Sequence, residues 1–112
     1  MKQKRLEAIC SFLSIEDKVI DIGCDHAYVP IYMAKKGTQK LLATDIHLNA
    51  LNVAKENIVK NHLEEVIQTS LSDGLDEVDT TGYDTIVIAG MGANTILNIL
   101  DNKSNILFII II

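Results

Sequence analysis

Acidic residues and glycines follow the apolar segments of this 112-residue chain, and they are its clearest candidates for chemistry. Asp21 lies within the apolar residues 18–22, where burial of an ionised carboxylate costs free energy unless donors meet it. Gly23 follows directly and allows a tight turn or a close approach of a ligand to the backbone. Taken alone, these residues are as typical of an ordinary strand-to-loop turn as of a binding site.

Comparable residues follow the next three apolar segments. Asp45 follows the second apolar segment, and its distance along the chain from Gly23 is near that of the acids that bond ribose hydroxyls in nucleotide-binding folds. A lone Asp at the end of a strand is more often a helix cap. Asp73 and Gly74 form a polar turn that could hold an adenine amino group, or be a simple turn. Residues 89–92, Ala-Gly-Met-Gly, would keep large side chains away from a small ligand. Each signal is weak, but their order along the chain describes one nucleoside-shaped crevice.

The charges of the first loop indicate which nucleoside would bind. Neither Gly-x-Gly-x-x-Gly nor Gly-x-x-x-x-Gly-Lys-Ser/Thr, the patterns that cradle phosphates, is present. Asp21 and Asp25 would repel a pyrophosphate and attract a cation. S-adenosyl-L-methionine, which carries a sulfonium and an ammonium group and no phosphate, fits these charges, whereas NAD and ATP fit them poorly.

The elements that must position these residues follow from the apolar pattern. Strands and helices alternate along the chain, and the strands are near-continuous aliphatic runs, which is typical of a parallel sheet covered on both faces. We therefore predict an α/β fold, a Rossmann-like doubly wound parallel sheet with its ligand at the carboxyl ends of the strands. The predicted strands are residues 18–22, 40–44, 66–69, 85–88 and 105–112; the predicted helices are 3–13, 29–36, 48–60 and 95–100.

Composition narrows the function classes. With 48% apolar residues the chain is not a disordered one, and a net charge of −5 disfavours a domain whose main task is to grip a nucleic-acid backbone. The longest apolar run, residues 106–112, is far shorter than the roughly 20 residues of a membrane span. The histidines and cysteines show no metal-ligand spacing. We expect a cytoplasmic protein with no metal and no membrane contact, with solvated basic residues at Lys2, Lys4, Arg5, Lys35, Lys36 and Lys40.

Two segments resemble a known family. Residues 21–30, Asp-Ile-Gly-Cys-Asp-His-Ala-Tyr-Val-Pro, and residues 88–92, Ile-Ala-Gly-Met-Gly, look like the bacterial tRNA (adenine-22-N1)-methyltransferases. These are class I enzymes that use S-adenosyl-L-methionine and have a Rossmann-like domain followed by a helical C-terminal domain. The first segment is specific, because ordinary class I methyltransferases carry Gly where Asp25 stands. The resemblance extends to about Leu100.

The resemblance implies a role for each matching residue. Asp25 is implied to be catalytic and to contact the target adenine, whose N1 lone pair needs no deprotonation, so that positioning dominates the reaction. His26 is more typical of a structural residue than of a catalytic one. The implied cofactor-binding residues are Asp21, Gly23, Cys24, His26, Ala27, Tyr28, Asp45, Ile46, Asp73, Gly74, Ala89, Gly90 and Met91.

The resemblance ends before the last predicted strand, where the family continues into a Gln-Pro-Asn segment, further strands and a basic helical domain. We therefore expect residues 1–112 to be the S-adenosyl-L-methionine-binding domain, with five of the seven strands usual in the family. The tRNA substrate would be gripped by a region absent here. The alternatives are a non-catalytic truncated binding or interaction module, which could self-associate through an exposed C-terminal strand, and, less well supported, a nicotinamide dehydrogenase.

Overall fold

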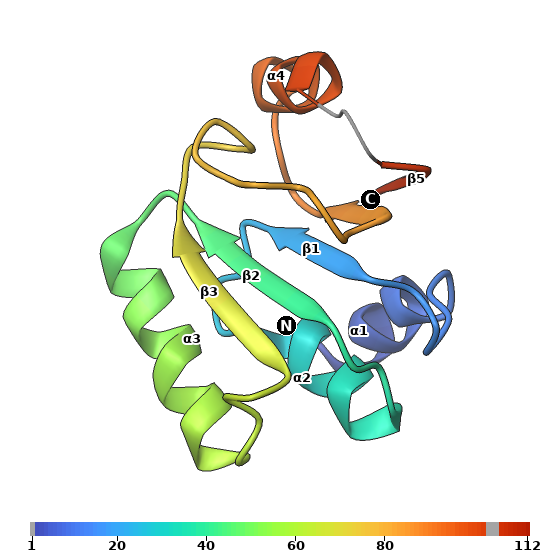
Figure 1. Cartoon of the computed structure of the whole chain (residues 1–112), viewed down its shortest axis with the longest axis vertical. Coiled ribbons are helices and arrows are strands. Elements are labelled where there is room, and N and C mark those ends of the chain that lie inside the picture. Colours follow the sequence, from blue (N-terminus) through green and yellow to red (C-terminus); the bar gives the residue numbers. More distant parts are fainter. Residues whose placement is uncertain (1, 103–105) are drawn as a thin grey trace.

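A parallel sheet with helices packed on both of its faces is formed by residues 2–102 and 106–112, which the computed structural model describes (Figure 1). Its strands are β1 (Val19–Ile22), β2 (Leu41–Asp45), β3 (Ile67–Leu71), β4 (Thr85–Ile88) and β5 (Phe108–Ile111). The helices are α1 (Gln3–Cys10), α2 (Tyr28–Lys36), α3 (Leu48–Lys60) and α4 (Ala93–Asn102). The predicted five-stranded α/β architecture is confirmed.

The strand order is β3-β2-β1-β4-β5, with every neighbouring pair parallel. The chain proceeds from β1 outward to β3 on one side and then returns to β4 on the other side. Ile22 is in register with both Thr44 and Ile88, so the three central strands end at the same level. The order in which the strands are added reverses between β1 and β4, so the loops that follow these two strands diverge. Open α/β sheets bind their ligands at such a switch point.

Alternate side chains of the central strands enter two different apolar clusters. On one face, Val19 and Val87 pack with residues of α1, α2 and α3, including the fully buried Ile9 and Met33. On the other face, Ile20, Ile86 and Ile88 of the strands form a second cluster. They pack with Ile99 of α4 and with Leu75 and Tyr83 of the segment before β4. The central strands are therefore buried on both faces, which explains why they read as continuous aliphatic runs.

The ends of some elements differ from the predicted ones. The helix predicted over residues 3–13 ends at Cys10, because the N–H groups of Phe12 and Leu13 bond three residues back and tighten the last turn. The helix predicted from residue 95 begins at Ala93. The start of the last predicted strand, residue 105, lies outside the described residues, and the observed strand begins at Phe108.

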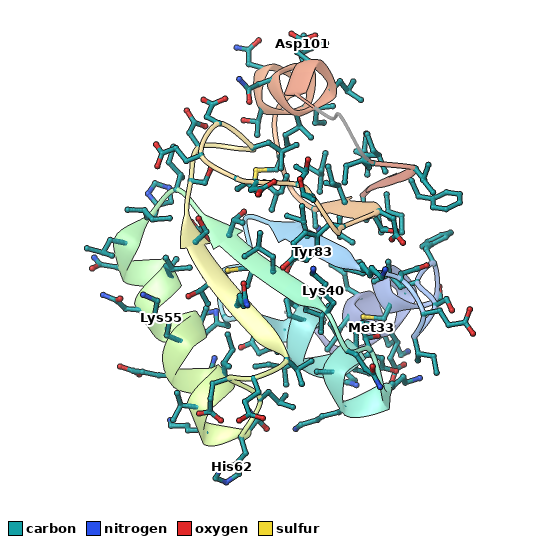
Figure 2. The ribbon with its side chains drawn as sticks, in the orientation of Figure 1. Met33, Lys40, Lys55, His62, Tyr83 and Asp101 are labelled. Atoms are coloured by element: carbon teal, nitrogen blue, oxygen red, sulfur yellow. The ribbon has the colours of Figure 1, made fainter. Side chains whose placement is uncertain are left out.

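A cation–π contact lies at the opposite ends of the strands. Figure 2 shows Lys40 beside Tyr83 there, and its ammonium group lies 4.8 Å from the ring centroid. This cation–π contact joins the start of β2 to the segment before β4. Among residues 2–102 and 106–112, no helix is long and apolar enough to cross a membrane.

Candidate functional site

Two adjoining clefts open at the carboxyl ends of the strands. The first, of about 360 Å³, is lined by the loops that follow β1, β2, β3 and β4, and the second, of about 440 Å³, lies between α1, the end of β1 and the start of α2. Gly23, Asp25 and Ala89 line both clefts. Each volume is typical of a small-molecule site, and the shared walls allow one elongated ligand to occupy both.

Asp45 organises the first cleft from the end of β2. Its Oδ2 atom accepts the backbone N–H of Asp25 at 3.0 Å, and its Oδ1 atom accepts that of His47 at 2.9 Å. Its backbone carbonyl accepts the N–H of Ser72, which ties the loop after β3 to the same point. A carboxylate oxygen can accept a further hydrogen bond, so this buried side chain can still receive ligand hydroxyls.

The loop between β1 and α2 is held in an unusual conformation. Gly23, Asp25 and Ala27 have φ angles of +74°, +51° and +63°. A residue with a side chain is disfavoured in this left-handed region by roughly 1–2 kcal/mol. Long-range hydrogen bonds compensate: besides the bond to Asp45, Asn57 of α3 donates to the carbonyl of His26 at 2.9 Å.

Two features require a glycine at position 23: its positive φ angle and its close contact with Met91. A Cβ atom at this position would overlap the Cε atom of Met91, which reaches across from the end of β4. The first loop and the Ala-Gly-Met-Gly segment are therefore packed against each other at the switch point. This contact explains why a glycine and a flexible methionine face each other between the two clefts.

Asp21 lies in the wall of the second cleft with its carboxylate almost completely buried, at 4% exposure. Within the part of the chain that the structure describes, no group donates a hydrogen bond to this carboxylate. Burial, and then the negative charge of Asp45, raise its pKa from 3.8 to about 7. A cation bound in the second cleft would favour the ionised form.

Cys24 lines the same cleft but is a poor candidate for nucleophilic chemistry. Burial raises the pKa of its thiol, and the neighbouring carboxylate of Asp21 raises it further. The thiolate is the reactive form of cysteine, so Cys24 is inert near neutral pH.

Two cations at the start of α1 line the second cleft together with these acids. Lys2 and Arg5, which the sequence gave reason to expect only on a solvated face, line it together with Tyr28 and Val29. Lys2 immediately precedes α1 in an extended conformation, Arg5 lies in its first turn, and the neighbouring Leu6 is buried. The second cleft therefore contains charges of both signs.

Asp25 stands at the junction of the two clefts with an exposed side chain. Its Oδ2 atom lies 3.2 Å from Nδ1 of His26, without the alignment of a hydrogen bond. The ring of His26 stacks on that of Tyr28, with centroids 5.1 Å apart and an interplanar angle of 16°. His26 and Ala27 line neither cleft, and Ala27 is fully buried in the core.

Most of the predicted site residues are thus brought to one place. Twelve of the fourteen line the clefts: Asp21, Gly23, Cys24, Asp25, Tyr28, Asp45, Ile46, Asp73, Gly74, Ala89, Gly90 and Met91. Sequence reasoning missed Lys2, Arg5, His47 and Thr95 as lining residues, and Asn57 as a support. For Lys2 and Arg5 the sequence offers no signal, because it does not show that the start of α1 approaches the end of β1. Asn57 has no signal either, because its partner lies on a distant loop.

The charges indicate what the clefts can hold. Over residues 2–102 and 106–112, no group of three His, Cys, Asp or Glu side chains could hold a metal ion. A phosphate in the first cleft would meet Asp25, Asp45 and Asp73. A nucleoside that carries a cationic end instead matches Asp21, whose carboxylate receives no hydrogen bond within the described residues.

The comparisons with known proteins agree with this geometry. A family model described as a methyltransferase domain matches residues 2–110. TrmK from M. capricolum, solved with the cofactor product S-adenosyl-homocysteine, is 36% identical with a TM-score of 0.84, over 95% of this chain and 49% of that one. The B. subtilis m1A22 tRNA methyltransferase TrmK is 31% identical with a TM-score of 0.81, over 90% of this chain and 44% of that one.

A curated relative is similar over most of this chain too. A ribosomal protein L11 methyltransferase from Listeria welshimeri is 34% identical over 92 residues, which are 82% of this chain and 29% of the relative. The chain therefore spans about half the length of the solved relatives and less than a third of this curated one. The resemblance to the adenine-N1 enzymes is confirmed by the solved relatives. Because the family model covers nearly every residue, the chain belongs to the methyltransferase domain family.

Proposed function

We propose that this chain is the S-adenosyl-L-methionine-binding, catalytic domain of a tRNA methyltransferase that acts on N1 of an adenine. The observation that carries the proposal is the position of Asp25. The structure places it at the junction of both clefts, in a left-handed conformation held by Asp45, and the family resemblance implies that this position is Gly in ordinary class I methyltransferases. The likeness to two TrmK enzymes supports the same substrate class.

The residues of the clefts fit the cofactor. Asp45 would accept ribose hydroxyls, and Asp73 with Gly74 would border the adenine ring in the first cleft. Asp21 would face the ammonium group from the second cleft. Ala89 and Gly90 offer little bulk between the two, where the sulfonium-bound methyl group must remain accessible. S-adenosyl-L-methionine supplies that methyl group as an electrophile when it is bound.

Asp25 would hold the acceptor base. The N1 atom of adenine carries an in-plane lone pair, so no base has to remove a proton before methyl transfer. An exposed carboxylate can accept a hydrogen bond from the adenine amino group and stabilise the positive charge that develops on the ring. Positioning of the base supplies most of the rate. A paired or stacked adenine would have to be flipped out to reach this point.

The test separates binding from transfer. Calorimetry with S-adenosyl-L-methionine should show binding, and Asp45→Ala should weaken it strongly because both the ribose acceptor and the anchor of the first loop are lost. Transfer is followed with labelled methyl groups on unmodified tRNA, and N1-methyladenosine is identified after nuclease digestion. Asp25→Asn should lower transfer while it leaves cofactor binding within about threefold, since the predicted partner of Asp25 is the acceptor base.

Asp101→Asn is the matched control for Asp25→Asn. Asp101 lies on α4, away from the sheet (Figure 2), and should affect neither binding nor transfer. Absence of any heat or thermal shift at millimolar S-adenosyl-L-methionine would refute the proposed function.

A protein acceptor is the second candidate, because the curated relative is an L11 methyltransferase. The same assay with ribosomal protein L11 in place of tRNA discriminates between the two. Methylation of L11 and not of tRNA would overturn the adenine assignment. Cofactor binding without transfer to either acceptor would instead favour the non-catalytic binding module.

A further inference from the structure

The outer rim of the second cleft is formed by exposed side chains. Asp21 forms a deep wall with 4% exposure, whereas the side chain of Asp25 is 68% exposed and Tyr28 is 36% exposed. Asp25 and Tyr28 are therefore at the mouth of the cleft, where an acceptor must enter. His26, which lies between them in the sequence, lines neither cleft.

The rings of His26 and Tyr28 form one stacked pair. Their centroids are 5.1 Å apart and their planes differ by 16°, which is the stacked geometry that aromatic side chains favour. Nδ1 of His26 has no hydrogen-bond partner within residues 2–102 and 106–112, so the stack orients the imidazole. Because Tyr28 lines the cleft and His26 does not, the tyrosine is the ring on the cleft side of the pair.

The backbone that carries this pair is held in place on both sides. Ala27, between the two aromatic residues, is fully buried and has a φ angle of +63°, and the carbonyl of His26 accepts a hydrogen bond from Asn57. Tyr28 is the first residue of α2, and the next two residues of this helix are buried. Strained backbone of this kind clusters at binding sites. The pair is therefore oriented before a ligand arrives, which lowers the entropic cost of binding.

The chemistry of the rim selects a flat group with hydrogen-bond donors at its edge. The exposed carboxylate of Asp25 accepts hydrogen bonds and repels a phosphate, while the face of an aromatic ring stacks on a nucleobase. The same carboxylate lies 3.2 Å from the imidazole that stacks on Tyr28. One adenine can therefore donate its amino group to Asp25 and lay its ring face on Tyr28.

Methyl transfer changes the charge of such an adenine. The N1 lone pair forms the new bond to the methyl carbon, the carbon–sulfur bond breaks, and its electron pair stays on sulfur. The positive charge therefore moves from sulfur to the adenine ring. The electron-rich face of a tyrosine ring attracts a cation, so it binds the methylated base more strongly than the neutral one. An interaction that strengthens as this charge develops raises the rate of transfer.

We infer that Tyr28 stacks on the acceptor adenine and stabilises the charge that develops on it, and that His26 is a positioning residue that braces the tyrosine ring. This inference rests on the proposed function, since it deepens the account of the same site. Asp25 would recognise the amino edge of the base and Tyr28 its face. The aromatic pair is thereby assigned to the acceptor, whereas the family resemblance implies that both residues contact the cofactor.

Nucleoside titrations test this inference without methyl transfer. Adenosine and 1-methyladenosine, which carries the positive charge of the product, are added to the complex of the chain with S-adenosyl-homocysteine. NMR signals of the His26 and Tyr28 rings should shift with both nucleosides, and 1-methyladenosine should bind about tenfold more tightly. Tyr28→Leu should lower this preference about fivefold, and Tyr28→Phe should keep it within twofold. Absence of ring shifts, or an unchanged preference in Tyr28→Leu, would overturn the inference.

The transfer assay with unmodified tRNA provides a second readout. Tyr28→Leu should lower kcat about tenfold and Tyr28→Phe less than threefold, while the affinity for S-adenosyl-homocysteine in calorimetry stays within twofold. His26→Ala should lower kcat and raise KM for tRNA, and His26→Phe should restore both because it keeps a stacked ring. Tyr32→Leu is the matched control, because Tyr32 lies on the same helix and lines neither cleft. It should leave these three values unchanged.

The outcomes separate this inference from the proposed function. Equal losses of transfer and of S-adenosyl-homocysteine affinity in Tyr28→Leu would assign the ring to the cofactor and overturn the inference while the proposed function stands. Unchanged kcat in Tyr28→Leu would also overturn it. Failure of His26→Phe to restore transfer would refute the bracing role of the imidazole ring. Failure of the unaltered chain to bind S-adenosyl-homocysteine would instead refute the proposed function.

Discussion

Replacement of Asp21 by Asn should stabilise the free protein, and the gain should grow as the pH rises. Burial and the charge of Asp45 raise the pKa of Asp21 from 3.8 to about 7 in the folded state. Between these two values the folded state binds more protons than the unfolded state. The ionisation of Asp21 therefore lowers the free energy of unfolding progressively across this window, and the loss is complete above about pH 7.

The size of this effect follows from the two pKa values. A rise from 3.8 to about 7 corresponds to a penalty on the order of 4 kcal/mol at pH 8. At pH 5 the folded state keeps its proton, and the penalty is only about 1.5 kcal/mol. Asn is neutral at both values, so the stabilisation by Asp21→Asn should be about 2.5 kcal/mol larger at pH 8 than at pH 5. Asp45, Asp25, Arg5 and Lys2 also face this site, and they are the same in both proteins.

Urea unfolding of both proteins at pH 5 and pH 8 measures this difference, because urea adds no ions that would screen the charges. Asp101→Asn, an exposed acid on α4, should show no pH-dependent change. The same Asp21→Asn protein should bind S-adenosyl-homocysteine more weakly at pH 8, since the ammonium group loses its partner. Equal stabilisation at both pH values would refute the burial argument. Stability given up for binding is common at functional sites.

Three further changes test the site and the sheet edge. Gly23→Ala should destabilise the fold by about 1–3 kcal/mol in urea unfolding and weaken cofactor binding, because the residue has φ +74° and the added Cβ would overlap Met91. Gly92→Ala should do neither, because no atom lies within 4 Å of its added Cβ. Equal effects of the two substitutions would contradict the packing argument. Asn57→Ala should lower the free energy of unfolding by about 1 kcal/mol and lower the cofactor affinity in calorimetry, because the carbonyl of His26 in the first loop loses its donor. An unchanged affinity would show that the loop is held without Asn57. Ile111→Lys should reduce concentration-dependent self-association in light scattering, because β5 is the last strand of the sheet order and Ile111 is 49% exposed. A monomeric unaltered chain at all concentrations would contradict self-association through β5.

The sheet could be predicted because its strands obey a simple rule. Every residue of β1, β2 and β4 is buried, and a segment buried on both faces must be aliphatic along its whole length. Residues that break this pattern, such as Asp21 and Asp45, therefore stood out. In a parallel sheet the ends of adjacent strands meet, so the order of these breaks along the chain also predicted where they gather.

The shape of the first loop could not be predicted in this way. Asp25 and Ala27 adopt a conformation that local preferences reserve for glycine. They are held there by Asp45, which lies 20 residues from its partner, and by Asn57, which lies 31 residues from its own. Single-sequence patterns describe neighbours along the chain, and these contacts exist only once α3 has packed on β2 and β3. The approach of α1 to the end of β4 was hidden for the same reason.

Asp45 links this loop to the electrostatics of the cofactor site. Its two carboxylate oxygens accept the N–H groups of Asp25 and His47, so the carboxylate that shapes the loop is held in place beside the cofactor site. That same charge adds to the effect of burial on Asp21 and opposes its ionisation. A cationic ligand in the second cleft favours the ionised form of Asp21 and so offsets the repulsion between the two acids. Binding should therefore be accompanied by release of a proton near neutral pH, and the stabilisation of the protein by its cofactor should increase from pH 6 to pH 8.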